Sequence, residues 1–352
     1  MTSTSSSTTC AHCGKTAERA CTGCKDVPAI DGDIKTIYYC SSACQKEDWQ
    51  YHKVLCKRLQ TRKLFYLAGS VLQEMFYMYR EKMFDKLIAR IDKTQGRLIV
   101  YEGRYNPLIT AETDCLIQFP SKLCQTEKEK QSVLVHLACD DASAWLHDIL
   151  KYTLAGIASN ITEVRGVVKN KKLDIIAVDV LDNVQDTDFE HEFLEIKLLN
   201  GGEEYALDLS SAQYGYFEPI VPWRKYLQTR VSKLATSQHF NYFGGAKDRL
   251  VAEKGDTDVK GIIASLNTES AQELMSSTKE WEEEYKMPIM KMMKLPFPEF
   301  KMKEKQLVDF IADNLGQYHA WLRGRAEKDK AEAARSDAGG NSKQTKTRQK
   351  GL

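Results

Sequence analysis

Eight residues near the start of the chain have the types and spacing of metal ligands. Seven of the ten cysteines fall within the first 56 residues, together with one histidine. They form two Cys-x2-Cys pairs, one Cys-x3-Cys pair and one His-x3-Cys pair, namely Cys10 and Cys13, Cys21 and Cys24, Cys40 and Cys44, His52 and Cys56. Eight thiolate and imidazole ligands predict two tetrahedral zinc ions. Since protein ligands fill both sites, we expect structural rather than hydrolytic zinc.

The spacing within each pair explains how its members reach one ion. A Cys-x2-Cys knuckle turns two sulfurs toward the metal, and an i, i+4 pair lies on one face of a helical turn. Spacing alone permits sequential or interleaved pairing of the four pairs. Thiols that only pack in a core would not recur in such regular pairs. A disulfide framework is disfavoured because the Ser/Thr-rich start has no secretory signal, so we expect an intracellular protein without choosing between nucleus and cytoplasm.

The segment from Tyr39 to Cys56, YCSSACQKEDWQYHKVLC, resembles the MYND zinc finger, and the resemblance covers residues 10 to 56. The cross-braced pattern of that family implies one zinc on Cys10, Cys13, Cys40 and Cys44 and the other on Cys21, Cys24, His52 and Cys56. MYND fingers dock short, often proline-containing peptides, and the resemblance implies Gln45 and Trp49 as contact residues. The alternative for Trp49 is a core-filling role, which a module this small needs.

Other proteins that carry this finger suggest further alternatives. The finger occurs on lysine methyltransferases with a SET domain, but this chain has no Asn-His-Ser/Cys run, so we do not expect that activity. A transcriptional regulator is an alternative that rests on the family association alone. The stretch ALDLSSAQYG at residues 206–215, followed by Pro222 and Trp223, resembles fungal MYND-containing proteins and implies a fungal source.

A second group of residues has the types needed for nucleophilic catalysis. Cys139 lies near the start of a predicted helix, His191 opens a predicted strand, and Asp208 ends the next strand. In thiol catalysis a histidine deprotonates the sulfur and a carboxylate orients the imidazole. With a strand that contains Arg165-Gly166 between the helix and the histidine, this order resembles the transglutaminase-like branch of the papain-like fold over about residues 130–215.

Several features of the sequence weigh against catalysis at Cys139. The acidic neighbours Asp140 and Asp141 disfavour a thiolate, and no oxyanion donor is identifiable. A buried structural thiol is the alternative, because free cysteine is among the most buried residue types. The sequence therefore favours an adaptor that binds a protein partner through its finger. A thiol-dependent hydrolase or acyltransferase that uses Cys139, His191 and Asp208 is the second hypothesis.

The hydrophobic pattern predicts an α+β protein, with the small two-zinc finger followed by a helical and antiparallel-sheet body. Helical periodicity predicts helices over 57–93, 127–158, 259–286 and 303–323. Short runs rich in Val, Ile and Leu predict a four-stranded antiparallel meander over 162–168, 173–181, 192–199 and 204–209. We expect a disordered N-terminus over 1–9, the finger over 10–56, the body over 57–325 and a disordered basic tail over 326–352.

Composition excludes several classes of protein. The 352 residues are 42% hydrophobic and 28% charged, which is typical of globular chains and not of wholesale disorder. No uninterrupted apolar run approaches the roughly 18 residues that span a bilayer, so we expect no membrane association. With 50 Lys and Arg against 49 Asp and Glu, the chain has no global positive field that would attract nucleic acid.

Overall fold

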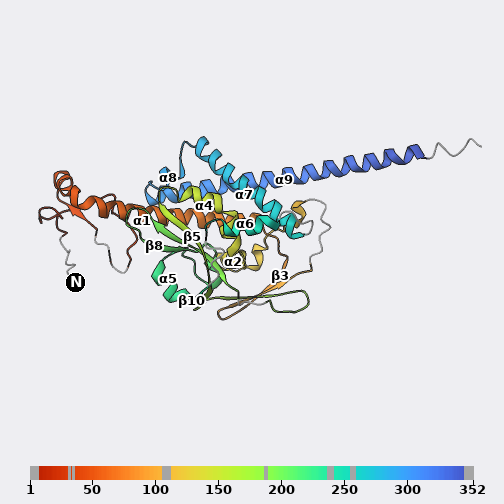
Figure 1. The fold of residues 1–352 in the computed structure, drawn as a ribbon, viewed down its shortest axis with the longest axis horizontal. Coiled ribbons are helices and arrows are strands. Elements are labelled where there is room, and N and C mark those ends of the chain that lie inside the picture. The colour runs from red at the N-terminus through yellow and green to blue at the C-terminus, as the bar shows by residue number, and fades with distance from the viewer. Residues whose placement is uncertain are drawn as a thin grey trace, which may run out of the picture.

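The computed structural model describes residues 8–30, 33, 36–104, 112–185, 189–235, 242–253 and 259–344. The zinc-ligand segment lies at one end of the molecule, the body forms the middle, and the last helix projects from the opposite side (Figure 1). None of the described helices combines the length and the apolar composition needed to cross a membrane. Residues 1–7 and 345–352, which belong to the expected disordered ends, lie outside the described residues.

One helix, α1 (Ser42–Lys82), joins the finger to the body without a linker. Ser41 caps it by accepting a hydrogen bond from the backbone N–H of Cys44, at 3.2 Å. The expected boundary after Cys56 therefore falls inside a continuous helix. The expected extension of this helix to residue 93 is wrong, because the chain turns into the strand β3 (Ile88–Thr94), which pairs with β4 (Arg97–Glu102) across a turn at Gly96.

The main sheet has five antiparallel strands in the order β10-β5-β7-β8-β9. Three of the four expected strands lie in it, but β6 (Asp174–Val178) pairs in parallel with β4 in a separate three-stranded sheet. The expected four-stranded meander is therefore wrong. Local pattern identifies a strand but does not name its partner. The strands of the main sheet are β5 (Ala158–Val168), β7 (His191–Leu198), β8 (Glu204–Leu207), β9 (Ile220–Pro222) and β10 (Val231–Leu234).

Three short helices replace the single one expected over 127–158. The chain breaks between the first two of them, where Leu137 adopts a left-handed φ of 61° just before Cys139. These helices are α2 (Glu127–Leu134), α3 (Cys139–Trp145) and α4 (His147–Thr153). The remaining elements are β1 (Arg19–Ala20), β2 (Tyr38–Tyr39), α5 (Trp223–Arg230), α6 (Gly245–Ala252), α7 (Val259–Glu284), α8 (Ile289–Met292), α9 (Phe297–Gln344) and the 3-10 helices η1 (Glu112–Cys115), η2 (Ser121–Leu123) and η3 (Ser211–Tyr214).

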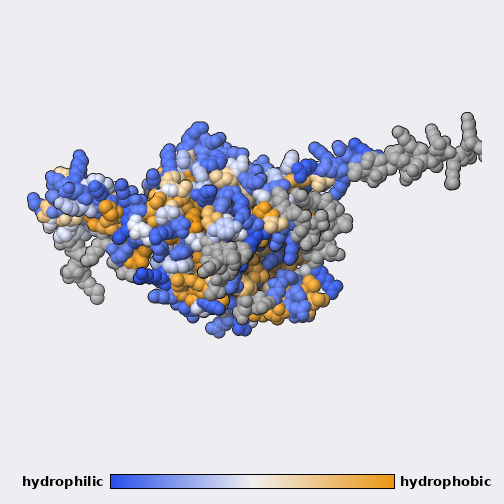
Figure 2. Space-filling view, viewed as in Figure 1, coloured by the Kyte–Doolittle hydropathy of each residue, from blue (hydrophilic) through white to orange (hydrophobic). Residues whose placement is uncertain are grey.

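Helix α1 runs through the core of the body, where α9 and α4 pack against it. Its buried residues, such as Phe65, Leu72 and Phe76, join one hydrophobic cluster with Trp281 of α7 and Phe300 of α9. Where we expected a tail without regular structure, α9 continues to Gln344. Residues 326–332 are Ala, Glu, Lys and Asp, mostly good helix formers, and hydrophilic side chains cover this projecting part (Figure 2).

A buried arginine on α1 fastens the finger to the body. The guanidinium of Arg62 is 1% exposed and donates to both oxygens of Asp33, at 3.0 and 2.6 Å, and to Glu203 in the β7–β8 turn, at 2.9 and 2.5 Å. It also donates to the carbonyl of Pro28, at 3.1 Å. The Arg62 guanidinium holds the pKa of Asp33 below its usual range. The long loop of the finger, helix α1 and the sheet thus share one charge cluster.

Replacing Arg62 with alanine should destabilise the protein by about 2 kcal/mol, because two carboxylates lose their shared cation. The value is lower than for a fully buried pair since Asp33 and Glu203 are 33% and 17% exposed. Urea unfolding followed by circular dichroism measures it. The control is Arg58→Gln, whose half-exposed side chain has one contact with Glu203 at 3.4 Å and should cost less than about 1 kcal/mol. Equal losses in both variants would contradict the proposed role of Arg62.

Candidate functional site

The eight predicted ligands come together as two interleaved groups of four. Within each group the ligand atoms all lie within 4.8 Å of one another. The first group has Cys13 Sγ at 3.5 Å from Cys40 Sγ, which is 3.4 Å from Cys44 Sγ. In the second, Cys21 Sγ is 3.8 Å from Cys56 Sγ, and His52 Nε2 is 3.3 Å from Cys24 Sγ. The groups are Cys10, Cys13, Cys40 and Cys44, and Cys21, Cys24, His52 and Cys56.

These distances fit two tetrahedral zinc ions. Ligands about 2.3 Å from a common zinc in tetrahedral geometry lie about 3.8 Å apart, close to the observed separations. Free thiols at this density are unfavourable, since burial and the neighbouring thiols Cys56 and Cys21 raise the pKa of Cys24 well above its usual range. Burial lowers the pKa of His52, which favours the neutral ring that a metal ligand requires. The interleaved pairing is the one that the resemblance implied.

Two glutamines donate hydrogen bonds to sulfurs of the second site. Neither of these roles could be predicted from the sequence. Gln60 Nε2 donates to Cys56 Sγ at 3.2 Å, and Gln45 Nε2 donates to Cys21 Sγ at 3.8 Å. Donors of this kind offset the thiolate charge and orient the ligands. Both amide groups lie on α1, so the helix that carries three of the eight ligands also supplies donors to the sulfurs.

The family model described as "MYND finger" matches residues 10–56. Residues 10–56 are a MYND finger. The module binds two zinc ions in cross-braced sites and belongs to a class of protein-interaction domains. The match covers the zinc-binding segment.

Curated relatives match short stretches of the chain. The "SET domain and MYND-type zinc finger protein 6" of Schizosaccharomyces pombe is 33% identical over 90 residues, which are 25% of this chain and 16% of the relative. The human and mouse "Tudor domain-containing protein 1" are each 39% identical over 54 residues, 15% of this chain and 4% of the relative. The chain therefore matches less than a fifth of each relative's length. No solved structure matches the chain.

The expected peptide-contact residues lie one helical turn apart at the start of α1. The side chain of Trp49 is 42% exposed, and its ring makes an edge contact with His52, with centroids 6.2 Å apart. Gln45 is half-buried. Trp49 thus supports the second zinc site with one edge and leaves much of its surface accessible, so it does not act as a core residue alone.

The predicted histidine and aspartate form a buried pair on the main sheet. His191 Nε2 lies 3.0 Å from Asp208 Oδ2, and both residues are at most 2% exposed. Tyr226 on α5 donates its hydroxyl to the same carboxylate oxygen at 2.7 Å, and the backbone N–H of Ser210 donates to the other at 3.2 Å. The sequence did not indicate Tyr226, which follows Asp208 by eighteen residues on a different element.

Cys139 completes the group from the first position of α3, which packs against β7. Burial alone would lower the pKa of His191, but the Asp208 carboxylate and then the Cys139 thiol raise that pKa to about 10. With Nε2 occupied by Asp208, Nδ1 has no partner of normal hydrogen-bond geometry in the described part of the chain. Nδ1 is therefore the ring atom available to the thiol. The structure brings the three residues together, and their catalytic role stays a prediction.

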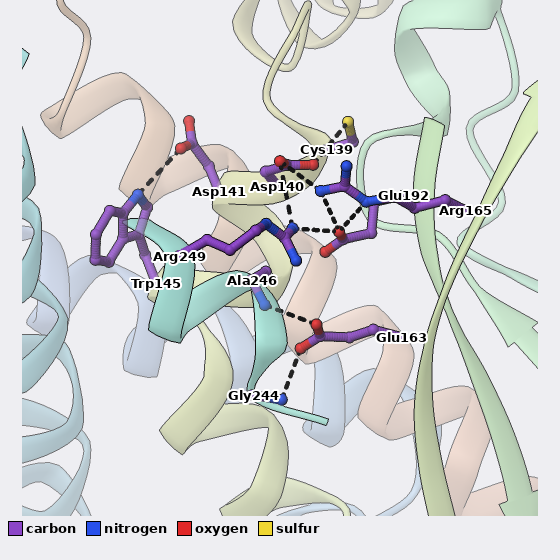
Figure 3. A network of polar contacts seen from close by, with 10 residues as sticks. All are labelled: Cys139, Asp140, Asp141, Trp145, Glu163, Arg165, Glu192, Gly244, Ala246 and Arg249. Atoms are coloured by element: carbon purple, nitrogen blue, oxygen red, sulfur yellow. Dashed lines mark hydrogen bonds and ion pairs between the residues drawn. The ribbon is translucent and has the colours of Figure 1, made fainter. Parts of the chain in front are cut away.

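The acidic neighbours of Cys139 are neutralised by arginines (Figure 3). Asp140 accepts from the Cys139 thiol at 3.6 Å and pairs with Arg165 at 2.8 Å and Arg249 at 3.5 Å. The same two arginines hold the buried Glu192, at 2.9 and 2.8 Å. The expected repulsion between these carboxylates and a thiolate is thus offset by cations that sequence spacing did not reveal.

Asp141 points away from the thiol. It accepts from Arg80 at 2.8 Å and from the indole of Trp145 at 3.0 Å (Figure 3). Arg80 lies on α1, so this pair ties α3 to the central helix. The two adjacent aspartates therefore have different tasks, and neither carries an uncompensated charge beside Cys139.

We predict that the wild-type chain binds two zinc ions and that Cys56→Ser binds one or none. Because the ligand pairs interleave, losing one ligand weakens the fold that also presents the other site. Elemental analysis of purified full-length protein measures zinc per chain. Cys124→Ser, which changes a cysteine outside the finger, should retain two ions. Two ions in Cys56→Ser would contradict the ligand assignment.

Proposed function

We propose that this chain is an adaptor whose MYND finger docks a proline-containing peptide of a partner protein on Gln45 and Trp49. The observation that carries the proposal is the 42% exposed Trp49 ring beside the second zinc site. An exposed indole supplies a large apolar surface with a polar handle, which suits recognition of a peptide. Zinc coordination fixes the start of the helix that carries Trp49. Peptide binding therefore costs little conformational entropy on the side of the finger.

The attachment of the finger supports an adaptor role. Helix α1 runs unbroken from the peptide-contact residues into the core, and Arg62 fastens the finger loop to the sheet. A bound peptide would therefore be held in a defined orientation relative to the body. By their names, the relatives carry this segment in one chain with different domains, a SET domain in one and a Tudor domain in the other. This is expected of a binding module that occurs in many protein contexts.

Zinc-thiolate chemistry supports an intracellular location for this function, because reduced cysteines persist there. A fungal source and the domain bounds given above remain parts of this proposal. A role in transcriptional regulation is a separate alternative, which rests on the family association alone. The partner is a protein in each case. A nucleic acid is disfavoured by the balanced charge of 50 basic and 49 acidic residues.

Trp49→Ala should weaken binding of proline-containing peptides at least tenfold while leaving zinc content unchanged. The peptides are displayed as an array, and hits are measured by fluorescence anisotropy with the full chain. The matched control is Tyr51→Ala, which removes a 77% exposed aromatic ring from another face of the same helix and should bind as the wild type does. Equal binding by Trp49→Ala and the wild type would show that Trp49 does not contribute to peptide binding.

We infer a second candidate function, thiol-dependent hydrolysis or acyl transfer at Cys139, from the buried His191–Asp208 pair. In this mechanism the thiol proton already resides on His191, the sulfur attacks an acyl carbonyl, and His191 passes the proton to the leaving group. Water or another nucleophile would then cleave the thioester and restore the thiol. Cys139 is 7% exposed, which favours a small acyl group. The transglutaminase-like arrangement of residues 130–215 belongs to this second proposal.

Alkylation by iodoacetamide, read peptide by peptide with mass spectrometry, tests the thiol. An ordinary cysteine slows about 50-fold between pH 8.5 and 6.5 because its thiolate fraction falls. Despite burial, the Asp208 carboxylate raises the pKa of His191 to about 10, so the ring carries a positive charge beside the Cys139 sulfur at both pH values. Alkylation of Cys139 should therefore slow less than fivefold over this range.

Two comparisons make the alkylation test specific. In His191→Asn the ordinary pH dependence should return. Cys124 is half-buried, and burial raises its pKa to about 11, so it should react slowly at both pH values in every variant. If Cys139 titrates like an ordinary thiol in the wild type, or is unaffected by His191→Asn, the residue is a structural thiol.

A further inference from the structure

Arg230, at the end of α5, is a buried cation that forms no ion pair within the described part of the chain. The residue is 8% exposed, and its Nη1 has no hydrogen-bond partner in the described part of the chain. Its guanidinium lies over the ring of Tyr216, 4.0 Å from the centroid, and 5.5 Å from that of Tyr226. Stacking on rings satisfies the face of the guanidinium but not the N–H groups at its edge.

The Asp208 carboxylate, on which the charge of Arg230 acts, is already engaged. Asp208 feels the charge of Arg230, which is among the causes that lower the pKa of Asp208. Its oxygens, however, accept from His191, Tyr226 and Ser210. No ion pair joins Arg230 to any carboxylate among the residues that the structure describes. Since an unpaired buried charge is strongly unfavourable, the site calls for an external anion.

Arg230 lines a cavity of about 360 Å³ between the finger and the sheet. Two further cations, Lys172 and Lys225, line it together with one acidic residue, Glu218. Lys172 Nζ lies 4.7 Å from the centroid of the Tyr216 ring, on which the Arg230 guanidinium also stacks. The remaining wall is apolar or aromatic and includes Ile30 of the finger, Tyr66 of α1, Ile220, Val221 and Pro222.

We propose that this cavity binds a small organic anion, whose carboxylate or phosphate oxygens pair with the edge of the Arg230 guanidinium. A planar fork of N–H donors suits either oxyanion, and the two lysines add charge at the mouth. The apolar wall accommodates the carbon skeleton of the ligand. This site uses none of the zinc ligands, the Trp49 face or Cys139, and its test reads the melting temperature and not an activity, so its failure would leave both functions proposed above standing.

The test measures the melting temperature of the full-length, zinc-loaded chain during titration with inorganic phosphate and, separately, with acetate. Sodium chloride keeps the ionic strength constant, so general screening cannot mimic binding. We expect a saturable rise of roughly 2 °C at a tenfold excess of anion over its Kd, as mass action requires. The arm with the lower half-saturation concentration identifies the ligand as a phosphate or a carboxylate. No saturable rise with either anion overturns the proposal.

Arg230→Met is the decisive variant, since it keeps the length and packing of the side chain and removes the charge. It should lose the anion-dependent rise and, without anion, melt at or above the wild-type temperature because an unpaired buried charge is gone. Lys225→Gln removes an exposed charge from the wall of the cavity, and because the side chain is exposed the variant should fold normally. It should raise the half-saturation concentration about threefold or more. Lys233→Gln is the matched control, because it removes one exposed charge from the adjacent strand β10, outside the cavity.

Two results would contradict the proposal even where the wild type responds to anions. An undiminished rise in Arg230→Met would place the anion elsewhere. A melting temperature of Arg230→Met far below that of the wild type in anion-free buffer would show that the guanidinium is already satisfied within the fold. Equal effects of Lys225→Gln and Lys233→Gln would reduce the response to general electrostatics.

Discussion

Zinc coordination on the first four turns of α1 is the constraint from which the rest of the arrangement follows. Cys44, His52 and Cys56 lie on this helix, and their partners come from a segment that has only two two-residue strands of its own. Without the metal, thiols would crowd at 3.4 to 3.8 Å, and burial together with neighbouring thiols raises the pKa of Cys24. Because the same helix becomes the core of the body, the metal orders the end of an element that the body also stabilises.

This shared helix explains why the link between finger and body is charged. A helix alone would let the finger loop move relative to the sheet, whereas Arg62 bonds to both parts at once. A buried guanidinium is costly unless its donors are used, and here Asp33, Glu203 and the carbonyl of Pro28 use them. The cluster forms only when finger and sheet are in one relative position. It therefore contributes specificity of orientation more than free energy.

The finger could be predicted in detail from the sequence because its chemistry is local. Ligand type and spacing determine the geometry, and the family resemblance resolved the pairing that spacing left open. The body was less predictable for a physical reason. Strand β6 has the same hydrophobic pattern as its neighbours, yet it pairs with β4, more than seventy residues earlier in the chain. Local pattern carries no information about so distant a partner. Likewise, the arginines that neutralise Asp140 come from β5 and α6, so no local signal could reveal them.

The candidate thiol group was found from the sequence because strands alternate and adjacent strands pair. His191 on β7 and Asp208 just after β8 were expected to be neighbours, and their ring and carboxylate are 3.0 Å apart. The sequence could not show their burial, the hydroxyl of Tyr226, or the position of Arg230 behind the carboxylate. Tyr226 and Arg230 lie on α5, which follows an irregular segment and packs against β8. Their positions therefore could not be predicted from local sequence.

Two buried groups near Asp208 are the ones that the proposals above would satisfy. His191 Nδ1 and Arg230 Nη1 are buried without a hydrogen-bond partner of normal geometry in the described part of the chain, as are atoms elsewhere in the body such as Thr153 Oγ1 and Trp281 Nε1. Each unsatisfied group costs free energy of about 1 to 3 kcal/mol, so such an atom carries an argument only where a neighbouring group or cavity is at hand. His191 has the Cys139 thiol beside it, and Arg230 lines a cavity, which distinguishes these two from the rest.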